Sequence, residues 1–150
     1  MIKIYVDADA SPVKNEVLRV AKRYGLKVYF VANFKMRFPQ DDLVEMVVVD
    51  EELDAADNWI EERIGDKDIV VTGDVPFASR CLKKNARVLD PKGRVFTEET
   101  IGEALAHRDL MTYLRDTGNI THGPTPRGKR DNSRFLQRLD DLIQALLRGK

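Results

Sequence analysis

The feature that most constrains the fold of this chain is a repeated alternation of short apolar runs with amphipathic segments. The apolar runs cover residues 2–6, 27–32, 46–49 and 68–72, and a shorter one covers 87–89. Continuous apolar runs of this length are typical of strands covered on both faces, as in a parallel sheet. The segment between the first two runs has its apolar residues at helical spacing and ends at Gly25. The pattern therefore predicts an α/β fold, a three-layer sandwich with a mostly parallel sheet.

The length of the chain predicts a single domain over residues 1–150, because 150 residues are enough to build one proper core. Further helices are expected at about 53–64, at 98–118 with an interruption near Arg108, and at about 133–147. The last of these is expected to pack on the domain, because it carries four apolar residues on one side: Phe135, Leu139, Leu142 and Leu146.

Aspartates follow two of the predicted strands. Asp7 and Asp9 come where the first strand ends, and Asp74 comes just past the end of the fourth. Because the carboxyl ends of parallel strands meet at one edge of a sheet, these carboxylates are expected to lie together. Asp7 and Asp9 are two residues apart, so both can aim at one point. After them, Ser11 is expected to cap a helix that has Pro12 in its first position.

A fourth aspartate is predicted to face inward from a helix. Within the helix expected over 53–64, Asp57 falls three residues before Ile60 and shares its apolar stripe. A lone buried carboxylate is costly, so the site must supply a partner, a proton or a metal. Asp54 lies one turn earlier and could join it. If this helix crosses the carboxyl edge of the sheet, all four acids converge.

Clustered carboxylates without His or Cys suit a hard, oxygen-seeking cation. Mg²⁺ or Mn²⁺ fits such a site and structural Zn²⁺ does not. Such an ion polarises a phosphate and activates water, which predicts phosphoryl-oxygen chemistry. Each acid also has a structural alternative, because Asp9 and Asp74 could cap helices and Asp7 could bond backbone amides in a turn. Taken together, the four positions favour a cation site whose catalytic residues are Asp7, Asp9, Asp57 and Asp74.

Basic and polar residues near these acids could contact a substrate. The chain has no net charge, but residues 127–150 hold seven basic and three acidic side chains. A basic segment beside an acidic site suits a phosphate-bearing substrate, although solvated helices carry arginines anyway. The candidate substrate contacts are Lys14, Asn33, Arg130 and Asp131. For Lys14 and for the basic cluster at 127–130, the alternative is an ordinary solvated side chain.

The segment 34–39 mixes aromatic with basic residues in a predicted loop. Its two phenylalanines could stack on nucleic-acid bases, but we favour an arrangement in which they cover the core. Residues 118–128 contain Gly, Pro and Thr and are expected to form an extended loop.

The other reactive residue types give weaker signals. Cys81 is expected to be a small buried hydrophobe rather than a nucleophile, and His107 and His122 have no ligand spacing. A single cysteine cannot form an internal disulfide, which favours a reducing compartment. No apolar stretch approaches the roughly 20 residues that span a bilayer, and the N-terminus has no signal-peptide pattern. We therefore expect a cytoplasmic protein without a membrane partner.

Several motifs resemble those of a known family. They are DADASPVK at 7–14, ADN at 56–58, VVTGDVP at 70–76 and KRD at 129–131, so they extend over essentially the whole chain. They resemble the YaiI/YqxD family of uncharacterised bacterial proteins. One departure is that the family usually has Cys where this chain has Ser11, which argues against a thiol mechanism here.

That family in turn resembles the PIN-like and NYN nuclease superfamily. The resemblance implies a PIN-like fold, in which the carboxyl edge of a parallel sheet gathers aspartates around Mg²⁺ or Mn²⁺ to cut RNA. It implies Asp7, Asp57 and Asp74 as the metal ligands, with Asp9 and Asp54 as auxiliary acids.

Three functions stay open at this point. The leading hypothesis is a metal-dependent phosphodiesterase that acts on RNA. The second is a non-catalytic module that binds nucleic acid or another protein. The third is a small-molecule phosphatase of the haloacid-dehalogenase type, which also begins with a strand and Asp-x-Asp. That class places a turn and a flap after the aspartates, whereas here a helix is expected almost at once.

Overall fold

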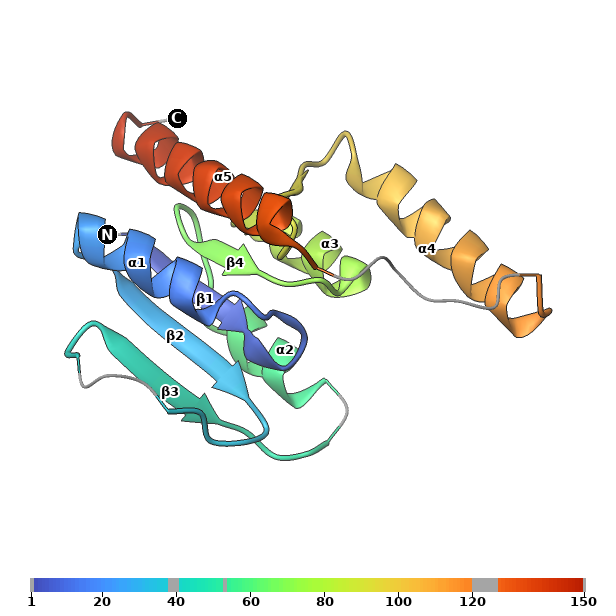
Figure 1. Cartoon of the computed structure of the whole chain (residues 1–150), viewed down its shortest axis with the longest axis horizontal. Coiled ribbons are helices and arrows are strands. Elements are labelled where there is room, and N and C mark those ends of the chain that lie inside the picture. The colour runs from blue at the N-terminus through green and yellow to red at the C-terminus, as the bar shows by residue number, and fades with distance from the viewer. Residues whose placement is uncertain (1, 38–40, 53, 120–126, 150) are drawn as a thin grey trace.

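A computed structural model describes residues 2–37, 41–52, 54–119 and 127–149. Within this part of the chain one sheet contains six strands: β1 (Lys3–Asp7), β2 (Lys27–Ala32), β3 (Val44–Val48), β4 (Ile69–Val71), β5 (Arg87–Leu89) and β6 (Val95–Phe96). Their spatial order is β3-β2-β1-β4-β5-β6, and only the β5–β6 pair is antiparallel (Figure 1). The strand order therefore reverses between β1 and β4, which is where ligands bind in open α/β sheets.

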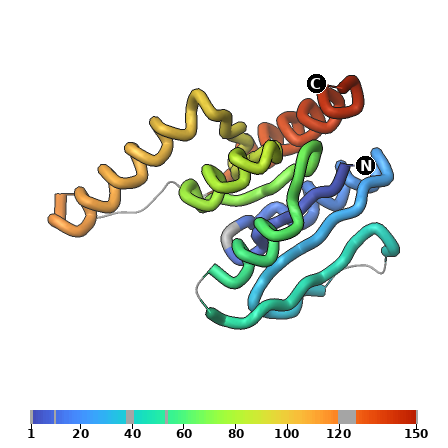
Figure 2. Tube along the Cα trace, turned by 180° about the vertical axis from the view of Figure 1, so that it is seen from behind, coloured from blue at the N-terminus to red at the C-terminus, as the bar shows by residue number. Residues whose placement is uncertain are grey.

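Helices cover both faces of this sheet. They are α1 (Lys14–Tyr24), α2 (Ala55–Glu61), α3 (Val75–Lys83), α4 (Ile101–Asp116) and α5 (Lys129–Leu147), with a short 3-10 helix over Ala8–Ala10. Side chains of α1 and α5 share one buried cluster with the sheet, and those of α2, α3 and the start of α4 share the other. The predicted three-layer α/β sandwich is confirmed. The second half of α4 extends away from the sheet in both views (Figures 1 and 2).

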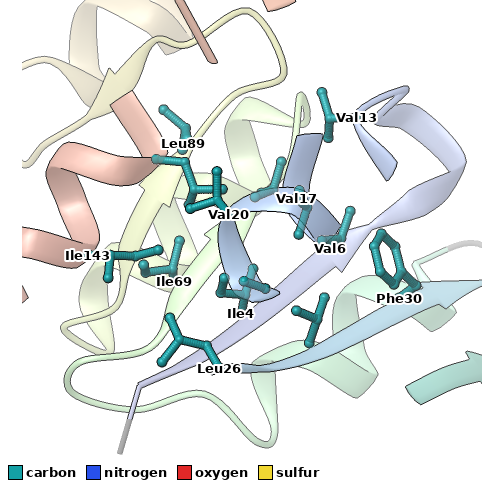
Figure 3. Close-up of a cluster of buried hydrophobic side chains, with 14 of the residues drawn as sticks. Ile4, Val6, Val13, Val17, Val20, Leu26, Phe30, Ile69, Leu89 and Ile143 are labelled. Atoms are coloured by element: carbon teal, nitrogen blue, oxygen red, sulfur yellow. The ribbon is translucent and has the colours of Figure 1, made fainter. Parts of the chain in front are cut away.

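The core under α1 and α5 consists of strand residues that face helix residues. Ile4 and Val6 of β1 lie beneath Val17 and Val20 of α1, and Ile143 joins them from α5 (Figure 3). All five are almost completely removed from solvent. Burying such side chains stabilises the fold by about 1.5–3 kcal/mol each. This packing holds β1, and hence the acids at its end, in a fixed position.

The strands agree closely with their prediction. β2 and β5 have the predicted bounds, whereas β3 begins two residues before the expected Met46 and β4 is shorter than the expected run 68–72. The two-residue β6 was not predicted. It pairs with β5 across a tight turn, and two residues are too few to give a periodic signal.

The start of α1 differs from the prediction. The helix begins at Lys14, so the expectation that Ser11 caps it and Pro12 opens it is wrong. The chain first passes through the 3-10 helix Ala8–Ala10 and then extends at Ser11, with φ −132° and ψ 91°. The first turn is instead closed by the amide of Val17, which donates to the carbonyl of Val13 at 2.9 Å.

The later helices also differ at their ends. α4 is continuous, so the predicted interruption near Arg108 is wrong; Arg108 is exposed and fits a regular helix. α5 begins four residues earlier than expected, because the Asp131 carboxylate accepts a hydrogen bond from the Gly128 amide at 3.0 Å. Its predicted inward face is confirmed, since Phe135, Leu139 and Leu146 are buried.

Two predicted loops are only partly described. Phe34 is 50% exposed, so the expectation that it covers the core is wrong, and Phe38 lies outside the described residues. Most of the loop predicted over 118–128, with His122, also lies outside them. In the described part of the chain, no helix is both long enough and apolar enough to cross a membrane.

Candidate functional site

An acidic cleft lies at the carboxyl edge of the sheet, beside the point where the strand order reverses. It has a volume of about 280 Å³. Its polar lining comes from the end of β1, the connection that follows β2, the segment between β3 and α2, the start of α2 and the turn after β4: Asp7, Asp9, Asn33, Asp50, Glu52, Asp54, Asp57 and Asp74. The predicted convergence of four aspartates is thus found in one cleft.

Asp7 is the last residue of β1 and is 6% exposed. The hydroxyl of Thr72, just past the end of β4, donates to Oδ2 of Asp7 at 3.0 Å. Burial is the largest cause that raises the pKa of Asp7 to about 6. The Thr72 hydrogen bond opposes this rise, and the charges of Asp9 and Asp74 add to it. Asp7 is therefore a carboxylate that is held in place and lacks a full counter-charge.

Asp57 lies in the first turn of α2 and is also 6% exposed, which confirms that it faces inward. Its pKa is raised to about 7, first by burial and then by the charges of Asp7, Asp74 and Asp54. The guanidinium of Arg80 lies 4.0 Å from Oδ2 of Asp57 and offsets part of this effect. Arg80 is shared, however, because its Nε donates to Glu61 at 2.6 Å.

Asp74 has the capping role that the sequence offered as the alternative to a cation ligand. It is the N-cap of α3, and its Oδ1 accepts a hydrogen bond from the Phe77 amide at 3.1 Å. It also lines the acidic cleft. The Thr72 hydroxyl accepts from the Asp74 amide at 3.1 Å, so one threonine ties Asp74 to Asp7. The cap therefore fixes the orientation of a cleft carboxylate.

The remaining cleft residues lie nearer to solvent. Asp9 is exposed, and its Oδ1 accepts a long hydrogen bond of 3.4 Å from the amide of Asn33. Asp54 precedes α2 in a left-handed backbone conformation with φ 64°, which Asp tolerates better than most residues. Asp50 and Glu52 were missed by the sequence prediction. They follow β3 in an acidic run, so the strand-end rule that identified Asp7 would have found them.

The chemistry of this donor set fits a hard divalent cation, because among the described residues every ionisable side chain that lines the cleft is a carboxylate. Among the residues that the structure describes, however, no three His, Cys, Asp or Glu side chains form a group that could hold a metal ion. Mg²⁺ usually keeps several waters and is bound by one or two carboxylates together with substrate phosphates. Asp7 and Asp57 could supply such a pair.

Three of the four predicted substrate contacts lie outside the cleft. Lys14 donates from Nζ to the carbonyl of Arg37 at 2.9 Å, and Asp131 is engaged by the Gly128 amide. Arg130 is exposed in the first turn of α5. Only Asn33 joins the acids.

The buried position that the sequence predicted for Cys81 is confirmed. Cys81 is fully buried, and burial is the main cause that raises the pKa of its thiol to about 12. A thiol with such a pKa is protonated at neutral pH and does not act as a nucleophile. His107 is exposed on α4.

Comparison with known proteins assigns the family. A family model described as "Uncharacterized BCR, YaiI/YqxD family" matches residues 5–145. The chain belongs to this family. The match includes the whole acidic cleft and α5 as far as Ala145, and it confirms the resemblance seen in the sequence motifs.

Full-length relatives carry names that state no activity. A UPF0178 protein of Paramagnetospirillum magneticum is 54% identical over 143 residues, which are 95% of each chain. A UPF0178 protein of Rhodospirillum centenum is 52% identical over 154 residues, which cover 100% of both chains. One from Rhodopseudomonas palustris is 53% identical over 150 residues, covering 100% of this chain and 95% of the relative. These relatives therefore align with 95–100% of this chain.

Proposed function

We propose that this member of the YaiI/YqxD family is a phosphodiesterase that depends on Mg²⁺ or Mn²⁺ and hydrolyses RNA at the acidic cleft. The observation that carries the proposal is the pair of nearly buried carboxyls, Asp7 and Asp57, on one cleft. The charge of Asp7 contributes to the raised pKa of Asp57. Such a pair favours a bound cation. The resemblance of the family motifs to PIN-like and NYN nucleases supports RNA as the substrate.

In this proposal Asp7 and Asp57 hold the cation together with waters and substrate phosphates. The motif resemblance adds Asp74 as a third ligand, which requires the acids to move closer together when the cation binds, and Asp9 and Asp54 are auxiliary acids. The bound cation would polarise a phosphate and lower the pKa of a water. Thr72 orients Asp7 through its hydroxyl, and the cap on α3 fixes Asp74. These contacts orient Asp7 and Asp74 individually before a cation binds.

Calorimetric titration with Mn²⁺, paired with an assay of RNA cleavage, tests this function. We expect the parent to bind Mn²⁺ and to cleave RNA, and both activities to be lost in Asp7→Asn and Asp74→Asn. Asparagine keeps the volume at both sites and is as good an N-cap as aspartate, so α3 stays capped. Asp109→Asn is the matched control, because Asp109 is exposed on α4 away from the cleft.

Two results would contradict the proposal. One is a parent that cleaves no RNA with Mg²⁺ or Mn²⁺ although it is folded. The other is cleavage by Asp7→Asn and Asp74→Asn at the rate of the parent. A phosphoryl group trapped on Asp7 after incubation with a phosphate monoester would instead support the phosphatase alternative.

A non-catalytic binding module is the second candidate. It is favoured by the lack, within the described ranges, of any three acids grouped to hold a metal ion, and by the capping role of Asp74. A parent that binds RNA or a protein equally with and without EDTA, and cleaves nothing, would establish this candidate in place of the first.

A further inference from the structure

A second charged surface, of the opposite sign, lies at the same carboxyl edge of the sheet as the acidic cleft. It is formed by the turn between β5 and β6 and by the beginning of α5. We call it the basic edge, and its cationic residues are Lys92, Arg94, Arg127, Lys129, Arg130 and Arg134. Arg94, Lys129, Arg130 and Arg134 are exposed, and Lys92 and Arg127 are partly buried.

The basic edge also contains two acids, Asp90 and Asp131, whose carboxylates accept hydrogen bonds from backbone amides. Asp90 accepts hydrogen bonds from the amides of Lys92 and Arg94 at 2.9 and 2.8 Å. Asp131 accepts from the Gly128 amide, and its closest ion pair is a long one of 3.9 Å to Arg134. Because six cations outnumber these two carboxylates, the basic edge has a net positive charge, and four of its cations are exposed.

The turn and the helix form a rigid unit. Gly93 has φ +90°, and a Cβ placed there would lie 2.7 Å from Cγ of Arg134 and 2.9 Å from its backbone carbon, so the turn packs directly on α5. Arg127 donates to the carbonyl of Pro91 and, from Nε, to Asn132 at 2.7 Å. The cations are therefore presented by a preformed surface, which lowers the entropy cost of binding.

Sheet register places the β5–β6 turn of the basic edge at the same edge of the sheet as Asp7. Leu89, the last residue of β5, pairs with Val71, and the Thr72 amide donates to the Leu89 carbonyl at 3.1 Å. Thr72 is the residue that bonds Asp7. Because β1 and β5 are separated only by β4, the β5–β6 turn begins about 10 Å from Asp7. Figure 1 agrees, since α5 begins on the side toward which the β4 arrow points.

We propose that the basic edge binds the sugar–phosphate backbone of a single-stranded nucleic acid and guides it into the acidic cleft. This deepens the function proposed above and rests on it. Arg and Lys make the sequence-independent contacts to phosphates, and an anionic strand needs cations beside a cleft that itself repels it. Interfaces with proteins are instead depleted of charge at their centre and enriched in aromatic residues. A cleft of about 280 Å³ has room for one phosphate and its neighbours, and a single strand can follow such a cleft without the bending cost of a duplex.

Binding without divalent ions tests the inference separately from catalysis. The probes are fluorescein-labelled oligouridylate and oligothymidylate, measured by fluorescence anisotropy in EDTA over a range of salt concentrations. The test variant carries Arg94→Gln, Lys129→Gln and Arg130→Gln together. Loss of cations at the start of α5 does not weaken the helix, because a helix N-terminus prefers negative charge.

The matched control removes three positive charges at the opposite edge. It carries Lys22→Gln, Lys83→Gln and Arg148→Gln, which lie at or beside the last turns of α1, α3 and α5. All three side chains are exposed. The carboxamide of Gln144 donates to the Tyr24 hydroxyl at 3.2 Å, which places the end of α5 beside the end of α1 at the amino edge.

We expect the test variant to bind both probes about tenfold more weakly than the parent at moderate salt. The slope of log affinity against log salt should fall by about 2, at roughly 0.7 for each lost phosphate contact. The control variant should keep its affinity within about twofold, because distant surface charges are screened. If the test variant loses more affinity for oligouridylate than for oligothymidylate, the basic edge prefers RNA. If it loses the same affinity for both probes, the basic edge contacts features of the backbone that RNA and DNA share.

Three results would overturn the inference: no binding of either probe by the parent at low salt, equal weakening in the test and control variants, or poly-L-glutamate bound as tightly as the oligonucleotides.

Mn²⁺-dependent cleavage tests the proposed function and not the basic edge. If the parent binds as expected but never cleaves, the proposed function fails and the basic edge stands. If the test variant binds and cleaves like the parent, the basic edge fails and the proposed function stands.

Discussion

Replacing Asp57 with asparagine is expected to stabilise the metal-free protein at alkaline pH. The pKa of Asp57 is raised from an ordinary 3.8 to about 7, first by burial and then by the charges of Asp7 and Asp74. A raised carboxyl pKa means that the folded state disfavours the ionised form. Below the pKa of Asp57 in the unfolded chain, its ionisation costs no folding stability, because the carboxyl is then protonated in both the folded and the unfolded state. The penalty grows as the pH rises from about 4 to about 7 and is complete above that.

The size of this penalty follows from the pKa and the open cleft. Each tenfold change in acidity corresponds to about 1.4 kcal/mol, so the whole shift would correspond to about 4 kcal/mol. Water in the open cleft screens the carboxyl, and the Asp57→Asn variant would lose the long contact between Asp57 and Arg80. We therefore expect a gain of about 2 kcal/mol at about pH 8, and a smaller gain at about pH 5. For a chain of 150 residues this raises Tm by about 4–8 °C.

Urea unfolding in EDTA at both pH values measures this effect. The parent should lose stability between about pH 5 and about pH 8, and Asp57→Asn should lose less. Asp109→Asn, which changes an exposed acid of α4, should follow the parent at both values. If Asp57→Asn is no more stable than the parent at the higher pH, then Asp57 is not a disfavoured carboxylate and the electrostatic basis of the proposed cation site is refuted.

Three further predictions concern the neighbours of the cleft and the core. Thr72→Val should raise the pKa of Asp7 above about 6, because the variant loses the hydroxyl that donates to Oδ2; carboxyl ¹³C titration by NMR measures this, and an unchanged pKa would contradict it. Cys81 should react with a thiol reagent only after denaturation, because it is fully buried and its pKa is raised to about 12; prompt labelling of the native protein would contradict its core position. Phe135→Ala should lower the free energy of unfolding by about 3–5 kcal/mol in urea titration, because Phe135 is fully buried between α5 and the sheet; a loss below about 1 kcal/mol would mean that α5 is not docked as described.

The parts of the site that depend on local rules could be predicted from the sequence. Asp57 was predicted to face inward because its spacing from Ile60 is set by the helix alone, and it is 6% exposed. Asp7 and Asp74 were predicted to meet because parallel strands end at one edge, and both line the cleft. Ser11 shows the limit of such rules. A serine followed by proline is a strong start signal, yet α1 begins only at Lys14, because the backbone first turns through Ala8–Ala10.

Contacts between distant segments could not be predicted from local rules. Thr72 bonds Asp7 across 65 positions of the chain, and no spacing rule anticipates that bond. Asp74 was predicted as either a helix cap or a cation-site residue, and only the folded chain shows that it caps α3 while also lining the cleft. The predicted substrate contacts Arg130 and Asp131 both lie outside the cleft. The Asp131 carboxylate instead accepts a hydrogen bond from the amide of Gly128.

The sequence by itself determined the α/β class, the positions of β1 to β5 to within two residues, the buried face of α5 and the aspartates that gather at one edge. It could do so because apolar periodicity and strand-end geometry act over a few residues. Only the tertiary structure decided how much charge is left unbalanced in the cleft and where the cations lie. The raised pKa values of Asp7 and Asp57 come from burial and from the charges of neighbouring acids, and the basic edge exists because Gly93 packs against Arg134. Both depend on distances through space between segments far apart in the chain, which no local pattern encodes.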